Sequence, residues 1–134
     1  MLFKLQSLKD TQNLAKLLLS QLPKHSLLIL KGELGVGKTT LVQFLTKELN
    51  SEAIVTSPSY TLIHEYPSPE GLIVHIDAYR LASPDELFEL GLEDYLERAR
   101  LTVVEWGEDL FEYFPEASLV EIVFDNDCRI ANIK

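Results

Sequence analysis

A phosphate-binding loop pattern, G-x-x-x-x-G-K-[ST], is matched at every required position by Gly32-Glu33-Leu34-Gly35-Val36-Gly37-Lys38-Thr39. A short apolar run, residues 27–30, predicts a strand directly before this loop. Residues 40–49, directly after it, carry apolar side chains at the spacing of one helix face. The alternative is a glycine-rich turn that fits the pattern by chance, but such a turn would not require a strand before it and a helix after it. Strand, loop and helix together therefore predict a phosphate-loop domain.

The residue types in this loop suit a nucleoside triphosphate and Mg²⁺. Gly32, Gly35 and Gly37 allow backbone angles and a close approach that a Cβ atom would prevent, so that backbone N–H groups can point at the phosphates. The N-terminus of the next helix adds its unpaired N–H groups and its positive dipole end. We expect Lys38 to reach the β- and γ-phosphates and the Thr39 hydroxyl to bind Mg²⁺.

The bulk composition is that of one globular domain, which we expect to span residues 1–134. Hydrophobic residues make up 46% of the chain and charged residues 25%, which is ordinary for such a domain. The apolar runs are too short to cross a bilayer, and residues 1–5 lack the apolar core of a signal peptide. The single cysteine, Cys128, excludes an internal disulfide and a cysteine-based metal cluster. We therefore expect a cytoplasmic protein with no membrane contact.

The chain is strongly acidic, with 12 Lys and Arg residues against 21 Asp and Glu residues and a formal net charge of −9. Basic patches supply most of the affinity for a nucleic-acid backbone, so this balance argues against unaided binding to nucleic acid. A protein of this charge that acts on nucleic acid is expected to do so through a basic partner. The alternative is an acidic surface that serves solubility alone.

The pattern of apolar residues, caps and turns predicts an α/β fold, a three-layer domain like those of phosphate-loop NTPases, with a mixed parallel and antiparallel sheet. Strands are expected at residues 3–5, 27–30, 53–56, 60–66, 72–77, 101–104, 119–124 and 128–133. A first helix is expected after one of three possible caps, Ser7, Asp10 or Thr11, with dense apolar residues over 14–22 and an end at Pro23. Further helices are expected at residues 40–49, 83–90 and 92–99, with a short one ending at 114. Residues 60–66 and 72–77 are predicted to form an antiparallel hairpin with about seven residues a side.

Two acids, Asp77 and Glu105, directly follow apolar runs that predict strands. A carboxylate at the carboxyl end of a strand can meet a ligand there and hold Mg²⁺ or its water shell. The alternative is a carboxylate that caps a helix or pairs with a base, with Arg80 as the obvious partner of Asp77.

Other polar and aromatic residues carry weaker signals. His75 lies two residues before Asp77 on the same strand face, and His-x-Asp is a weak metal pattern; a packed or hydrogen-bonded strand histidine is the commoner case. Tyr79 and Trp106 are expected in the core or at its rim rather than as stacking platforms, and Cys128 as an inert strand residue. The chain has no Asn-Lys-x-Asp guanine-reading motif, which favours ATP.

Five motifs occur together in this short chain: Gly32–Thr40, Ser57-Pro58-Ser59-Tyr60-Thr61-Leu62, His75-Ile76-Asp77-Ala78-Tyr79-Arg80-Leu81, Glu89-Leu90-Gly91 and Val104-Glu105-Trp106. In this order they resemble the TsaE family, also called YjeE, over nearly the whole chain. Its members are bacterial phosphate-loop ATPases needed to make N6-threonylcarbamoyladenosine in tRNA. The loop alone would be generic, whereas the other motifs together are specific.

The resemblance implies a role for each matching position. The residues that would bind the ATP phosphates are Glu33, Leu34, Gly35, Val36, Gly37, Lys38, Thr39 and Thr40. Thr39 and Glu105 would hold Mg²⁺, and Asp77 would be the other essential acid, positioned for the attacking water or the Mg²⁺ shell. Lys38, Asp77 and Glu105 would therefore be catalytic. Residues 57–61 would be a switch-like segment near the γ-phosphate.

Two further matches lie near the expected nucleotide base, Asp10-Thr11 at the start of the first helix and Arg129 on the last hairpin. A plain surface arginine is the alternative at the latter position. The chain departs from the family pattern at two positions, with Glu33 where Asp is usual and Gly107 where Pro often follows the tryptophan. Neither change removes a needed group, but the second leaves the loop after Glu105 less rigid.

In activity, the resemblance implies an accessory ATPase rather than the enzyme that attaches threonylcarbamoyl. It would bind the TsaB–TsaD heterodimer and meet tRNA only through that complex, while the free chain would be a monomer or weak dimer. Two other functions stay open, a small-molecule phosphate-loop kinase and a non-hydrolytic ATP-dependent switch. A kinase usually needs a basic lid, for which Arg98 and Arg100 are poorly placed after an acidic helix. No arginine finger is evident in the loop regions, so we expect a partner to supply part of the site and the isolated chain to turn over slowly.

Overall fold

The computed structural model describes residues 1–33, 35–56, 62–81 and 83–134. Within them, one sheet has the strand order β1-β7-β6-β2-β5-β4-β3. The strands are β1 (Leu2–Leu5), β2 (Ser26–Lys31), β3 (Ile63–Tyr66), β4 (Ile73–Asp77), β5 (Leu101–Glu105), β6 (Ser118–Asp125) and β7 (Cys128–Ile133). The helices are α1 (Leu8–Gln21), α2 (Lys38–Glu48), α3 (Pro84–Glu89), α4 (Leu92–Arg98) and the 3-10 helix η1 (Glu108–Glu112).

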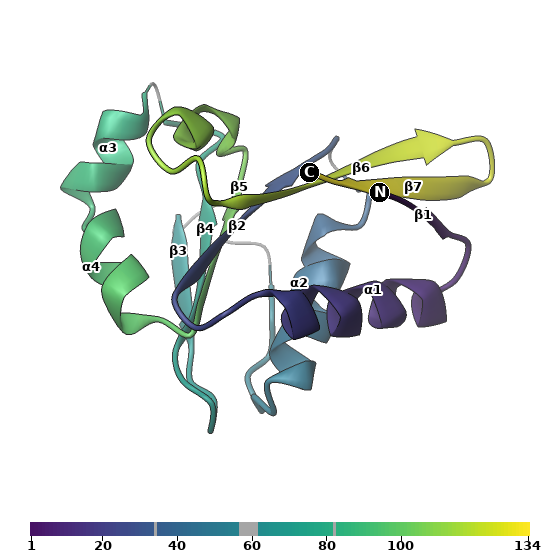
Figure 1. Cartoon of the computed structure of the whole chain (residues 1–134), viewed down its shortest axis with the longest axis horizontal. Helices are drawn as coiled ribbons and strands as arrows, with labels where there is room; N and C mark the ends of the chain where they lie inside the picture. The colour runs from purple at the N-terminus through teal and green to yellow at the C-terminus, as the bar shows by residue number, and fades with distance from the viewer. Residues whose placement is uncertain (34, 57–61, 82) are drawn as a thin grey trace.

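The sheet is parallel in its centre and antiparallel at both margins, which confirms the mixed sheet predicted from the sequence. Strand β2 lies between β5 and β6 and runs parallel to both, and β4 continues the parallel order beyond β5. The two hairpins, β3–β4 and β6–β7, add antiparallel strands, and β1 pairs with β7. The first and last segments of the chain therefore lie side by side, as Figure 1 shows.

Helices cover both faces of the sheet, so the fold has the three expected layers. In β2, Leu28 and Leu30 face a buried cluster that includes residues of α1 and α2, whereas Leu27 and Ile29 face a second cluster with residues of α3, α4 and η1. Figure 1 shows α1 and α2 on one side of the sheet and α3 and α4 on the other. Alternate side chains of a strand point to opposite faces, so an apolar strand such as β2 supplies both clusters.

Helix α1 begins after the first of the three cap positions that the sequence offers. Its N-cap is Ser7, whose Oγ accepts a hydrogen bond from the Asp10 amide at 3.3 Å while the Asp10 carboxylate accepts one from the Ser7 amide at 3.2 Å. This reciprocal capping box stabilises the first turn. The helix ends at Gln21, two residues before Pro23, as a proline there requires.

The strand expected at residues 53–56 is wrong. These residues form no regular secondary structure, and Ile54 is 86% exposed. Two side chains take the carbonyls that a strand would pair: Gln43 of α2 donates to Val55, and the Tyr66 hydroxyl donates to Thr56. The segment therefore packs Val55 into the buried cluster that includes residues of α2 instead of joining the sheet.

The hairpin is correct in direction but shorter than expected. Residues Ile63–Tyr66 pair with Ile73–Ile76, which gives four residues a side rather than about seven. Residues 57–61 of the expected strand and switch-like segment lie outside the described residues. Leu62 has a φ of 67°, which interrupts the extended backbone just before β3. Among the helices of the described ranges, none is both long and apolar enough to cross a membrane.

Candidate functional site

The carboxyl ends of three parallel strands meet at one edge of the sheet. Glu105 is the Cα partner of Leu30 on one side and of Asp77 on the other, and the phosphate-binding loop follows β2 directly. This edge is where open α/β sheets bind ligands. The fold thus brings together the loop and both strand-end acids, which are far apart in the sequence.

Close packing requires glycine at position 32 of the loop, and a positive φ favours glycine at position 37. A Cβ atom on Gly32 would lie 2.6 Å from the Ile122 carbonyl oxygen of β6 and 2.7 Å from Val36 Cγ1. Gly37 has a φ of 113° and is the N-cap of α2. Gly37 provides no side-chain cap for the first-turn amides of α2, and the first three residues of the helix line the cavity, so these amides are available to an anionic ligand. Leu34 lies outside the described residues.

Lys38 is a buried cation at the first position of α2, with a residue exposure of only 5%. Its Nζ donates to the Gly32 carbonyl oxygen at 2.5 Å, lies 3.9 Å from Glu105 Oε1, and lies 3.9 Å from the centroid of the Trp106 ring. Burial lowers the pKa of Lys38 below its usual 10.5, while the nearby carboxylates, Glu105 first and then Asp77, act to raise it. The amine is therefore held in a site that an anionic ligand would further stabilise.

The two acids are buried beside Lys38 and have separate partners. Asp77 Oδ1 accepts a hydrogen bond from the Tyr79 amide at 2.9 Å. Glu105 Oε2 lies 2.5 Å from Nε2 of His75, and its other oxygen, Oε1, faces Lys38. Both acids line the same cavity as the loop. The arrangement can hold a cation and a polyphosphate next to each other.

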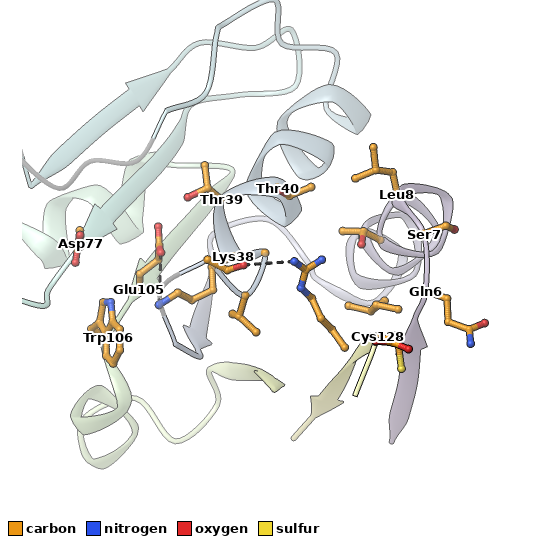
Figure 2. Close-up of a pocket in the computed structure, with 17 residues that line it drawn as sticks. Gln6, Ser7, Leu8, Lys38, Thr39, Thr40, Asp77, Glu105, Trp106 and Cys128 are labelled. Carbon is orange, nitrogen blue, oxygen red and sulfur yellow. Dashed lines mark hydrogen bonds and ion pairs between the residues drawn. The ribbon is translucent and has the colours of Figure 1, made fainter. Parts of the chain in front are cut away.

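The cavity has a volume of about 680 Å³ and collects most of the positions selected from the sequence. Figure 2 shows Asp77, Glu105 and Trp106 at one end, and Ser7 and Cys128 at the other. The lining residues that sequence analysis named as site residues are Thr11, Gly35, Val36, Gly37, Lys38, Thr39, Thr40, Asp77, Glu105 and Arg129.

Two expected positions do not line the cavity. The Glu33 side chain does not, although the Glu33 carbonyl oxygen accepts the Val36 amide at 3.2 Å and so shapes the loop. Asp10 is engaged in the helix cap, where its Oδ2 also accepts the Gln6 amide at 2.9 Å. Arg129 lines the cavity, with Nη2 at 3.5 Å from the Gly35 carbonyl oxygen, and its contact with a nucleotide base stays a prediction.

Sequence reasoning missed one wall of the cavity. That wall comes from the end of β1 and the start of α1, and from the β6–β7 turn; its members are Leu5, Gln6, Ser7, Leu8, Asp127 and Cys128. The pairing of β1 with β7 brings these segments together, and a contact between two segments so far apart in the sequence leaves no local sequence pattern. Cys128, expected as an inert strand residue, begins β7 and lines this wall.

The aromatic pair at the other end is at the rim of the core. Trp106 lines the cavity with a φ of 62°, and the centroid of its ring lies 5.0 Å from that of Tyr79, which is 63% exposed. Gly107 has a negative φ, but a Cβ there would lie 2.6 Å from Val104 Cγ1. This close packing restrains the loop after Glu105 at the position where the expected proline is missing.

Comparison with known proteins identifies the family. A family model described as "Threonylcarbamoyl adenosine biosynthesis protein TsaE" matches residues 5–131. The chain belongs to the TsaE family. It is 38% identical over 133 residues to the tRNA threonylcarbamoyladenosine biosynthesis protein TsaE of Rickettsia bellii, covering 96% of this chain and 91% of that protein. It is 33% identical over 115 residues to the protein of the same name from Bacillus subtilis, covering 86% of this chain and 72% of that protein.

A solved structure agrees with this assignment. The crystal structure of Bacillus subtilis YdiB is similar with a TM-score of 0.80 and 27% sequence identity, over 99% of this chain and 83% of that one. The family resemblance and the α/β fold expected from the motifs are thus both confirmed.

Proposed function

We propose that this chain is an ATP-binding and ATP-hydrolysing protein of tRNA threonylcarbamoyladenosine biosynthesis. Membership of the TsaE family supports the pathway. One observation supports the activity: Lys38, Asp77 and Glu105 converge on the cavity that the phosphate-binding loop lines. These are the charges that phosphoryl transfer needs around a terminal phosphate.

ATP fits the site by charge and by shape. The close approach at Gly32 and the uncapped first turn of α2 suit a ligand that binds backbone amides. Lys38 would bind the β- and γ-phosphate oxygens. Burial disfavours the charged form of its amine, so an anionic partner there would stabilise that form strongly. Thr11 and Arg129, which also line the cavity, would contact the nucleoside.

Mg²⁺ fits the donor set because Thr39, Asp77 and Glu105, which line the cavity, offer oxygen ligands. Among the described residues, no three or more His, Cys, Asp and Glu side chains form a cluster that could hold a metal by itself. The Thr39 hydroxyl and the Glu105 carboxylate would hold Mg²⁺, which typically takes one or two protein ligands together with phosphates and water. The ion would neutralise charge on the phosphates, and Asp77 would orient a water molecule beside them.

Hydrolysis is favoured over transfer to a metabolite by the positions of two arginines. Arg100 donates to the carbonyl oxygens of Leu22 and Pro23, both at 3.2 Å, and Arg98 pairs with Asp94 on the surface of α4. Both side chains lie near the start of β5, at the opposite end of that strand from Glu105. They therefore do not provide the basic lid that a small-molecule kinase needs.

The acidic surface supports an accessory role in a larger complex. With a net charge of −9, this chain would leave the binding of tRNA to others, and we propose the TsaB–TsaD heterodimer as its partner in the cytoplasm. Among the residues that the structure describes, Arg129 is the single arginine in the cavity lining. We therefore propose that the partner completes the site and accelerates a weak Mg²⁺-dependent ATPase.

The test is reconstitution with TsaB, TsaD, tRNA, ATP and Mg²⁺. We expect Lys38→Ala to abolish both phosphate release and tRNA modification. Lys47→Ala is the matched control, since Lys47 is an exposed lysine in the last turn of the same helix and should leave both activities intact. Full tRNA modification with Lys38→Ala would refute the proposal. Full modification by Asp77→Asn and Glu105→Gln variants that bind ATP without hydrolysing it would instead show a switch protein.

A further inference from the structure

His75 is a completely buried histidine in direct contact with one of the site acids. Its Nε2 lies 2.5 Å from Glu105 Oε2, and its exposure is 0%. Strand alternation places both residues on the sheet face that carries α2, because Val74 and Val104 belong to the cluster on the other face. The contact joins two neighbouring strands, β4 and β5, just below the edge where the ligand site lies.

The surroundings of the ring determine which nitrogen donates. Nδ1 of His75 is buried and has no hydrogen-bond partner within the described residues, whereas Nε2 faces a carboxylate oxygen, which can only accept when ionised. A proton on Nε2 therefore satisfies the contact, and a proton on Nδ1 would be buried without an acceptor. The Tyr66 ring of β3 has its centroid 6.2 Å from that of His75, and its hydroxyl donates to the Thr56 carbonyl oxygen rather than to the imidazole.

The bond to His75 leaves Glu105 with one oxygen for a ligand. Oε2 is occupied by His75, whereas Oε1 lies 3.9 Å from Lys38 Nζ in the cavity. A rotation of the carboxylate would break the short bond to the imidazole, so the direction of Oε1 is fixed before any ligand arrives. Partners of this kind orient metal ligands, and their removal typically weakens metal affinity about 10- to 100-fold.

We propose that His75 is a positioning residue that fixes the Glu105 carboxylate through an Nε2–H donor, so that Oε1 is presented to Mg²⁺. This inference rests on the proposed function, because it assumes that the site binds Mg²⁺ with a nucleotide. His75 itself touches neither group. It preorganises the acid, and its loss would be felt in magnesium affinity before nucleotide affinity.

The test compares His75→Leu and His75→Gln. The leucine removes the donor, whereas the glutamine amide can place an N–H donor near the position of Nε2. His64→Gln is the matched control, because His64 is the Cα partner of His75 on β3 but binds Tyr66 instead of Glu105. The readout is equilibrium binding of a fluorescent, non-hydrolysable ATP analogue, first in EDTA and then over a magnesium titration.

We expect all variants to bind the metal-free analogue as the wild type does. The magnesium concentration at half-maximal effect should rise about 10- to 100-fold for His75→Leu and stay within about threefold of the wild type for His75→Gln and His64→Gln. Equal magnesium dependence in His75→Leu and the wild type would overturn the inference, as would an equal loss in the leucine and glutamine variants, which would indicate packing alone.

A second measurement does not depend on the variants folding. Nitrogen-15 spectra of the wild-type imidazole should show the proton of His75 on Nε2 and a bare Nδ1; a proton on Nδ1 would overturn the inference. The outcomes also separate the two proposals. A wild type that binds no analogue refutes the proposed function and this role with it. A wild type that binds the analogue with magnesium, but with no change in His75→Leu, refutes only the role of His75.

Discussion

Replacing Gly32 by alanine should damage both the fold and the site, by an amount that follows from the packing of the loop on β6. The added methyl would lie 2.6 Å from the Ile122 carbonyl oxygen and 2.7 Å from Val36 Cγ1. Neither neighbour can yield easily, since Ile122 belongs to the sheet and Val36 is completely buried. The loop must therefore retreat from β6, which at the usual cost of overpacking destabilises the protein by about 1–3 kcal/mol.

Thermal unfolding and nucleotide binding measure this prediction together. For a chain of this length the cost corresponds to a fall in Tm of about 3–12 °C. The displaced loop should also lose stabilisation by the ATP analogue. Gly91→Ala is the control, because Gly91 has a φ of 96°, open space around its Cβ position and no place in the cavity lining. It should cost only about 1–2 kcal/mol of backbone strain and leave binding intact. An unchanged Tm and unchanged binding in Gly32→Ala would refute the reasoning.

Three further predictions follow from single features of the site. Arg129→Ala should weaken analogue binding several-fold while leaving Tm nearly unchanged, because Arg129 reaches the loop at the Gly35 carbonyl oxygen from an exposed position; calorimetry measures the affinity. Desolvation raises the pKa of Glu108 above its usual 4.5, so the charged carboxylate destabilises the fold at pH 7. Glu108→Gln should therefore raise Tm at pH 7 but not at pH 4, where the carboxyl group is largely protonated; thermal melts at both pH values check this. Phosphate release by the isolated chain should be slow and should rise at least about 10³-fold with TsaB–TsaD, if the partner supplies an arginine; rapid hydrolysis by the pure chain would contradict this.

The parts of the site that the sequence could predict are those set by local chemistry. The loop pattern, the strand before it and the helix after it are all contiguous, so Lys38 and Thr39 could be placed without knowledge of the sheet. Asp77 and Glu105 could be selected because each ends an apolar strand, and carboxyl ends of parallel strands share one edge. The register that makes them Cα partners is a property of the assembled sheet.

The parts that escaped prediction depend on long-range contacts. The segment 53–56 has the composition of a strand, yet the side chains of Gln43 and Tyr66 take its carbonyls, a competition that composition does not reveal. The wall formed by the β1–α1 junction and the β6–β7 turn exists because β1 pairs with β7. Thr11 and Arg129 could be named only from the family resemblance, since neither lies in a pattern that specifies a ligand.

The buried charges of the site link these observations. Lys38 and Glu105 are at most 5% exposed, and both lie under a cavity that the rest of the fold leaves open. A buried charge without a full set of partners costs stability, so a fold retains one where the charge serves a ligand. His75 belongs to the same arrangement, because its Nε2 is committed to Glu105 while its Nδ1 has no partner within the described residues. From the sequence, His75 could be a metal ligand or a packed or hydrogen-bonded strand histidine. It contacts Glu105 and does not line the cavity, which favours the hydrogen-bonded strand histidine.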